Sequence, residues 1–353
     1  MNTSPHIAIL GGGLAGTFLA ARLCLEGKYV TLIDDFREGS ASAVAAGMFN
    51  VITGKFGAKS WMADELLNSL HEFLQIPAFE SLAEHITWQP IYRPFKAVEE
   101  YNKWQTRQYD PAFAHLVNFS ESPVFPGQIK NPHGGITILS CGWIAIHDFL
   151  ESLQWLLVRD MRMRLVRETI DYRQIDIHKK QINLSSDTIE FDQIVFCEGV
   201  RIKENPWFQG IPVIPNKGEI LTIKVPDLEL PFILSGKAYM IPQGNNEYVT
   251  GSIYLDEFTH PHPSKEGRAM IEDNLRKVLK IPYSIVDHRA GLRPTTADRR
   301  PIAGAHPDLP WVYVFTGFGT KGVLLSPHFS MLLAREISGE KNILPDEVRP
   351  ARF

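Results

Sequence analysis

Cysteine is scarce in this chain of 353 residues, with only Cys24, Cys141 and Cys197 present and no CxxC pair among them. That spacing excludes a cysteine-rich metal site, and the turn with His260 and His262 has no ligand-like partners either. We therefore predict no metal. Since all three cysteines stand in apolar surroundings, we expect buried, reduced thiols in a cytoplasmic protein.

An excess of positive charge is also missing, because 36 Lys and Arg residues stand against 40 Asp and Glu residues, a formal net charge of −4. Such a chain has no general electrostatic attraction to nucleic acid or to an anionic membrane. The arginines between residues 159 and 167 are expected to form a solvated face. The first apolar stretch is broken by Gly11, Gly12 and Gly13, so neither a secretory signal nor a membrane-spanning segment is expected.

An apolar run followed by a glycine cluster, IAILGGGLAGT, is the most informative segment that is present. Ile7–Leu10 is typical of a buried parallel strand, and Leu14–Glu26 has a helical pattern. Gly11, Gly13 and Gly16 occur here at GxGxxG spacing. The first glycine allows a tight turn, the second lets the backbone approach a phosphate, and the third allows the helix to pack closely on the strand. The segment predicts a pyrophosphate site at a helix start.

The residues after this helix agree with a dinucleotide site. Tyr29–Ile33 is typical of a second buried strand, and Asp34 follows at its end. A carboxylate there would accept hydrogen bonds from the ribose hydroxyls of an adenosine. The simpler alternative is that Asp34 or Asp35 opens a solvated turn.

The remaining pattern predicts a mixed α/β fold in which a Rossmann-like domain is interwoven with an antiparallel, β-rich domain. Helices are expected at Ala63–Leu74 and Lys265–Leu279, an edge strand with two prolines at Ile86–Phe95, and a buried parallel strand at Ile194–Cys197. The predicted nucleotide-binding domain comprises residues 1–75, 140–212 and 290–353, and the second domain comprises residues 76–139 and 213–289.

Four further segments follow the glycine turn and the acid at the end of the second strand in a fixed order along the chain. They are ASAVAAGM (Ala41–Met48), KGEIL (Lys217–Leu221), AGLRPTTADRRPIAG (Ala290–Gly304) and TGFGTKGVLLSP (Thr316–Pro327). In this order they resemble the D-amino-acid oxidase family of FAD-dependent oxidoreductases, with glycine oxidase and the sarcosine oxidases most similar in style. The resemblance covers nearly the whole chain and is weakest between about residues 49 and 135.

The resemblance implies FAD as the cofactor, bound non-covalently because no cysteine stands in the loops where related enzymes attach flavin. The pyrophosphate would lie on Gly11, Gly12, Gly13, Leu14, Ala15 and Gly16, with Asp34 at the ribose. The flavin ring would lie along Ser42, Ala45, Ala46, Gly47 and Met48, with its other edge near Gly317, Gly319, Thr320, Lys321, Gly322 and Val323. Gly199 would lie beside the cofactor, after Cys197 and Glu198 where related chains have small residues.

On the substrate side, the resemblance implies that Arg293 binds an amino-acid carboxylate. A guanidinium suits this task because its planar fork can form two parallel hydrogen bonds and stays charged when buried. The alternative for Arg293 is a structural ion pair. Tyr239 and Tyr254 would form walls of the substrate pocket or else pack as ordinary strand residues. Lys321 would either stabilise negative charge on the reduced flavin or be a solvated surface lysine.

The function implied is oxidation of the C–N bond of an amino acid or small secondary amine, with hydride transfer to flavin N5. The electron acceptor would be O2 or an unknown partner, and the oligomeric state is not specified by the sequence. Two alternatives are the oxidation of a carboxymethylamino-modified tRNA and a flavin-binding protein without amine turnover. A nicotinamide-dependent dehydrogenase is less consistent with the C-terminal GLRP and glycine segments.

Overall fold

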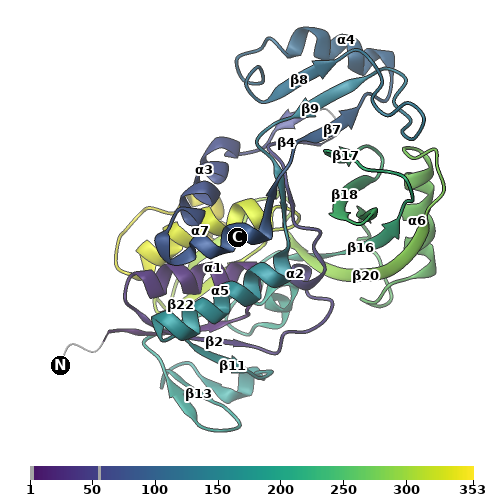
Figure 1. Ribbon diagram of the computed structural model, residues 1–353. Helices are drawn as coiled ribbons and strands as arrows, with labels where there is room; N and C mark the ends of the chain where they lie inside the picture. Colours follow the sequence, from purple (N-terminus) through teal and green to yellow (C-terminus); the bar gives the residue numbers. More distant parts are fainter. Residues whose placement is uncertain (1–3, 55–56) are drawn as a thin grey trace.

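The computed structural model of the protein describes residues 4–54 and 57–353. A mainly parallel sheet, called the parallel sheet below, has the strand order β11-β2-β1-β15-β22-β21 and lies toward the bottom of Figure 1. Only β21 runs antiparallel to its neighbour within this order. The strands are β1 (His6–Leu10), β2 (Tyr29–Asp34), β11 (Arg164–Arg167), β15 (Gln193–Phe196), β21 (Ile302–Ala305) and β22 (Val312–Thr316). The predicted parallel strands are therefore confirmed.

Both faces of the parallel sheet are covered, as its apolar strands require. Ile7 and Ile9 of β1 pack on the side of the helices, whereas Ala8 and Leu10 pack against residues of a small antiparallel sheet. The helices on the first side, seen together in Figure 1, are α1 (Leu14–Leu25), α3 (Ala63–Leu74), α5 (Ile146–Met161) and α7 (Gly322–Ile337). The small sheet consists of β12 (Ile175–Asp176), β13 (Gln181–Asn183) and β14 (Thr188–Glu190).

A second large sheet, called the antiparallel sheet below, has the order β20-β16-β19-β18-β17-β7-β9-β8, and within this order only β17 and β7 pair in parallel. Its strands are β7 (Ile91–Pro94), β8 (Val117–Ser120), β9 (Gly135–Ile138), β16 (Ile214–Lys224), β17 (Ile233–Ser235), β18 (Tyr239–Gly244), β19 (Glu247–Gly251) and β20 (Ser284–Thr295). Helix α6 (Lys265–Arg276) packs against β16 and β19, and α4 (Val98–Arg107) lies near β8 (Figure 1). The mixed α/β class and the antiparallel block are thus confirmed.

The remaining elements of the described chain are short. They are α2 (Ala41–Val44), β3 (Met48–Phe49), β4 (Ile52–Thr53), β5 (Ala58–Lys59), β6 (Ile86–Trp88) and β10 (Gly142–Ile144), with 3-10 turns at Pro77–His85, Tyr172–Gln174, Gly199–Glu204, Asp346–Val348 and Pro350–Arg352. The domain boundary predicted at residue 290 falls inside β20, and the division into two domains stays a prediction. In the part of the chain that is described, no helix is both long and apolar enough to cross a membrane.

The prediction of one edge strand at Ile86–Phe95 is wrong. The segment forms β6, which pairs with β10, and β7, which lies in the interior of the antiparallel sheet between β17 and β9. Proline is tolerated there because Pro90 precedes β7 and Pro94 is its last residue. A missing N–H at a strand end does not interrupt the hydrogen bonds of the strand interior.

A buried ionic cluster joins the antiparallel sheet to α6. The side chains of Lys217 and Glu219 are 2% and 0% exposed, and their Nζ and Oε1 atoms lie 2.9 Å apart. Glu219 also contacts His288 Nε2 at 2.7 Å and accepts a hydrogen bond from Ser264 Oγ at 2.7 Å. Burial alone would raise the pKa of Glu219, but these partners outweigh it and leave the pKa lowered. The resulting stabilisation is present near neutral pH and is lost as the pH falls through the folded-state pKa.

We predict that Lys217→Met lowers the free energy of unfolding by about 3 kcal/mol, because it leaves a buried carboxylate without its ammonium partner. Lys277→Met is the matched control, since Lys277 pairs with Asp273 on the surface of α6 and is half exposed. The control should change stability by less than about 0.5 kcal/mol. Urea unfolding of both variants measures the difference, and equal midpoints would contradict the prediction.

Candidate functional site

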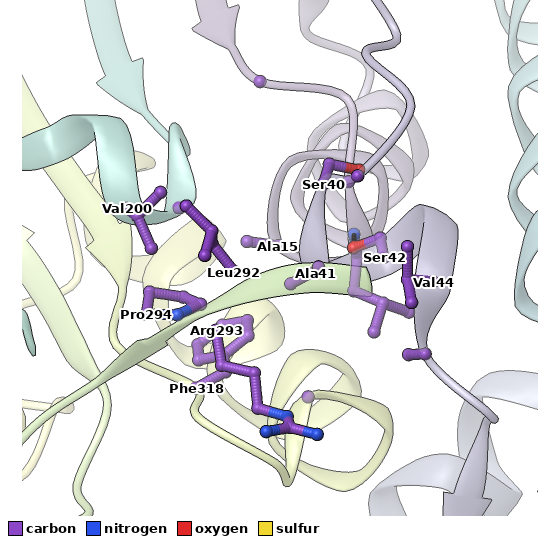
Figure 2. Close-up of a pocket in the computed structure, with 18 of the residues that line it drawn as sticks. Ala15, Ser40, Ala41, Ser42, Val44, Val200, Leu292, Arg293, Pro294 and Phe318 are labelled. Atoms are coloured by element: carbon purple, nitrogen blue, oxygen red, sulfur yellow. Dashed lines mark hydrogen bonds between the residues drawn. The ribbon is translucent and has the colours of Figure 1, made fainter. Parts of the chain in front are cut away.

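A cavity of about 500 Å³ lies between the carboxyl ends of the parallel strands and the antiparallel sheet. Its walls come from the glycine turn, the segment after β2, β20 and the start of α7 (Figure 2). Most of the residues predicted for the site line it, and they are Gly11, Gly13, Leu14, Ala15, Asp34, Ser42, Ala45, Ala46, Gly47, Met48, Gly199, Tyr239, Tyr254, Arg293, Gly319, Thr320, Gly322 and Val323. The tertiary structure thus brings distant predicted segments to one cavity.

The glycine turn has no room for side chains. Gly11 has a φ of +107°, and an added Cβ would lie 2.3 Å from the Cys197 carbonyl oxygen. At Gly16 an added Cβ would lie 1.8 Å from the Gly11 carbonyl oxygen, and at Gly13 it would lie 2.8 Å from Ser42 Oγ. The turn therefore presents bare backbone and the start of α1 to the cavity, an arrangement that can hold an anionic phosphate group.

Asp34 lies at the end of β2 and accepts hydrogen bonds from the backbone N–H groups of Gly12 and Phe36. Burial raises its pKa, although these two hydrogen bonds oppose the shift. The carboxylate is half-buried and lines the cavity. It thus braces the glycine turn while one side remains available to a ligand.

Arg293 extends from β20 into the same cavity, and its guanidinium lies apart from the other labelled side chains in Figure 2. Its Nη1 donates to Asn216 Oδ1 at 2.9 Å and to the Ile253 carbonyl oxygen at 3.2 Å. Burial lowers its pKa, but an arginine remains charged under ordinary conditions. Among the described residues no carboxylate lies within 4.0 Å of this guanidinium, so the alternative of a structural ion pair finds no partner.

The two tyrosines differ in their surroundings. Tyr239 is half-buried on β18, and burial raises the pKa of its phenol. Tyr254 is 61% exposed at the cavity mouth, and its ring centroid lies 4.7 Å from the Arg293 guanidinium carbon. Both line the cavity and can serve as its walls.

Gly12, Gly16, Gly317 and Lys321 are the predicted site residues that do not line the cavity. Gly317 has a φ of +81° and packs on Thr296, which explains a glycine at the turn after β22. Lys321 is half-buried immediately before α7, and burial lowers its pKa, with the nearby guanidinium of Arg300 acting in the same direction. It is therefore neither a fully solvated lysine nor a residue of the cavity wall.

Cys197 and Glu198 follow β15 and also line the cavity. Burial raises the pKa of the Cys197 thiol well above its usual range, which disfavours the nucleophilic thiolate. Glu198 accepts hydrogen bonds from Tyr172 Oη at 3.1 Å and Asn205 Nδ2 at 3.0 Å, and burial raises its pKa. All three cysteines are buried and free, as predicted.

Sequence reasoning missed the part of the wall that follows β11, and it missed Val200 and Arg201 in the turn after β15. The missed residues after β11 are Glu168, Thr169 and Ile170. A usable signal existed, because β11 pairs in parallel with β2 and the carboxyl ends of parallel strands meet at one edge. Within the described residues, no group of three or more His, Cys, Asp or Glu side chains is placed to hold a metal ion.

Comparison with curated proteins places the site in context. The chain is 24% identical to the tRNA 5-methylaminomethyl-2-thiouridine biosynthesis bifunctional protein MnmC of Legionella pneumophila (strain Corby), over 98% of this chain and 56% of that protein. It thus spans about half the length of these bifunctional relatives. It is 22% identical to the glycine oxidase of Pseudomonas aeruginosa, with 99% of both chains covered.

Two solved structures share the fold along the full chain. Glycine oxidase from Geobacillus kaustophilus superimposes with a TM-score of 0.80 at 20% identity, covering 99% of this chain and 100% of that one. Iminodiacetate oxidase from Chelativorans sp. BNC1 gives a TM-score of 0.79 at 19% identity, with 98% of each chain covered.

The family model described as FAD dependent oxidoreductase matches residues 6–336, which is most of the chain. This match includes the glycine turn, the strand that carries Arg293 and the start of α7. The resemblance predicted from the sequence is thereby confirmed, and FAD is the cofactor of the family. The protein belongs to the D-amino-acid oxidase family of FAD-dependent oxidoreductases.

Proposed function

We propose that the protein binds FAD non-covalently in this cavity and oxidises the C–N bond of a small amino acid or secondary amine that carries one carboxylate. The observation that carries the proposal is the Arg293 guanidinium, which shares the cavity with the glycine turn and has no carboxylate partner among the described residues. The name of one full-length relative, glycine oxidase, supports an amino-acid substrate with a single carboxylate.

The residues present fit the cofactor, because the glycine turn forms a cradle that a Cβ would fill. We infer that the pyrophosphate lies on Gly11, Gly13 and the start of α1, with the adenosine ribose at Asp34. The flavin ring would contact residues 42–48 on one side and residues 319–323 on the other. Gly12, Gly16 and Gly317 would support this arrangement through the backbone, since they lie outside the cavity wall.

When bound, FAD supplies a two-electron acceptor for a hydride at its N5 atom. Arg293 would hold the substrate carboxylate and so orient the Cα hydrogen toward the flavin. The substrate's own neutral amine would supply the electron pair that becomes the C=N bond of the imine product. No histidine lines the cavity in the described part of the chain, which agrees with a reaction that needs no strong protein base.

The cavity wall around Arg293 favours a substrate with a single carboxylate. The wall residues that the antiparallel sheet contributes besides Arg293 are uncharged, and they are Gly218, Ile220, Tyr239, Gly291, Leu292 and Pro294. The other arginines of the wall come from elsewhere, with Arg37 paired to Asp35 and Arg201 stacked on Tyr172. A second substrate carboxylate would therefore lose its hydration without gaining a cation.

The test is the absorbance spectrum of the purified protein during separate anaerobic additions of glycine, sarcosine, proline, D-amino acids, iminodiacetate and a carboxymethylamino-modified tRNA. We expect flavin bands that bleach with at least one monocarboxylate and less readily with iminodiacetate. Bleaching only with carboxymethylamino-modified tRNA would favour that alternative, and bands unchanged by every compound would favour a flavin-binding protein without amine turnover. A protein that takes up no FAD would contradict the proposal.

We predict that Gly13→Val prevents FAD retention, because the added side chain occupies the space between the turn and Ser42. Gly127→Val is the control, since an added Cβ there has no neighbour within 4 Å. Flavin fluorescence titration of the apoproteins measures binding, and circular dichroism verifies folding. A normal FAD affinity in a folded Gly13→Val protein would remove the glycine turn from the cofactor site.

We predict that Arg293→Met raises KM for the best substrate about 100-fold, the effect of losing charged hydrogen bonds of roughly 3 kcal/mol. FAD should remain bound. Arg289→Met is the matched control on the same strand, because Arg289 is 43% exposed, pairs with Asp287 and lies outside the cavity wall. Steady-state kinetics decide the matter, and an unchanged KM in Arg293→Met would refute the carboxylate role.

A further inference from the structure

Arg293 and Asn216 face each other across the longest strand pair of the antiparallel sheet. The register of β16 and β20 places Asn216 directly opposite Arg293. Directly opposite residues project to the same face, so their side chains can meet without a bend in either strand. Asn216 Oδ1 accepts the hydrogen bond from Arg293 Nη1 at 2.9 Å.

The orientation of the Asn216 amide is set by a second contact. Its Nδ2 donates to Asp256 Oδ1 at 2.7 Å, so its oxygen must point toward the arginine. Asn216 is 4% exposed, and water therefore competes little for either hydrogen bond. The negative charge of Asp256 thus orients the guanidinium through a neutral amide rather than by direct pairing.

This arrangement occupies only one corner of the guanidinium. Both acceptors on Nη1, the amide of Asn216 and the carbonyl of Ile253, are uncharged. In the described residues neither Nε nor Nη2 of Arg293 donates a hydrogen bond. Nε and Nη2 form the edge of the guanidinium whose two parallel N–H groups match a carboxylate, and we call it the bidentate edge. This edge and the full positive charge of Arg293 both remain available to a ligand.

Gly218 provides the space in which the guanidinium lies. It follows Asn216 by two residues on β16, and an added Cβ would lie 2.0 Å from Nη2 and 2.2 Å from Cζ of Arg293. Those atoms cannot approach so closely, so any side chain at residue 218 would displace the guanidinium. The glycine is required by this contact rather than by its backbone angles.

We propose that Asn216 and Gly218 are positioning residues that hold Arg293 in place while leaving its charge and its bidentate edge free for the substrate carboxylate. This inference rests on the proposed carboxylate role of Arg293. A carboxylate at position 216 would orient the arginine equally well, but it would also neutralise it and compete with the substrate. The neutral amide of Asn216 orients the Arg293 guanidinium without cancelling its positive charge.

The test exchanges the amide and the carboxylate in the double variant Asn216→Asp, Asp256→Asn. The exchange keeps the chain of hydrogen bonds and the total charge, and it moves the negative charge next to Arg293. The probe is propionate, whose dissociation constant is read from the perturbation of the flavin spectrum in the FAD-loaded protein. We expect propionate to bind at least about tenfold more weakly to the double variant than to the wild type. For the best amine substrate, KM should rise while kcat stays within about twofold of the wild-type value.

Gly218→Ala tests the same inference by a second route, with Gly127→Ala as its control. We expect Gly218→Ala to weaken propionate binding and Gly127→Ala to leave it unchanged. FAD affinity and melting temperature, measured for every variant, report a merely structural effect. Unchanged propionate binding in both the folded double variant and Gly218→Ala would overturn the positioning role.

Arg293→Met, measured in parallel, separates this inference from the function on which it rests. If Arg293→Met abolishes propionate binding while the double variant and Gly218→Ala do not weaken it, the carboxylate role stands and the positioning role fails. If the wild type does not bind propionate, or Arg293→Met binds it normally, the carboxylate role itself fails and the positioning role fails with it.

Discussion

The parallel pairing of β1 with β2 and β15 is the constraint on which the cavity depends. It brings the ends of these strands to one edge, where Gly11 packs directly on the peptide after β15 and Asp34 binds the backbone of Gly12. No side chain fits at these contacts, so the turn that opens α1 is left as bare backbone. A phosphate-binding surface arises because strand ends and a helix start are forced together.

The parallel sheet presents bare backbone to the cavity, whereas the antiparallel sheet presents a charged side chain in a largely apolar wall. The long pair of β16 and β20 carries Arg293 to the cavity, while a glycine and an amide of the facing strand surround its guanidinium. On the other face of β16, Lys217 and Glu219 form the buried cluster that ties the sheet to α6. Alternation along one strand thus separates an anchoring face from a face toward the proposed substrate.

The distribution of charge follows the same division. The carboxylates of the cavity wall stand on segments of the parallel sheet and the loops after it, where the proposed adenosine end of FAD would lie, and Arg293 stands alone on the antiparallel side. Burial raises the pKa of both Asp34 and Glu198. The proposed chemistry needs little more from the protein than this placement, because the substrate's amine supplies the electron pair.

The sequence by itself determined the elements whose signals lie within a short segment. These are the strand, glycine turn and helix of residues 6–25, the second strand ending at Asp34 and the helix at Ala63–Leu74. The order of its motifs also determined the family. It failed at Ile86–Phe95, where proline suggested an edge although its position at a strand end permits an interior strand. Only the tertiary structure decided that Glu168 and Arg201 reach the cavity, that Lys321 does not line it, and that Asn216 faces Arg293. Those facts depend on strand order and register, which are set by packing between segments far apart in the chain and leave no periodic mark in either segment alone.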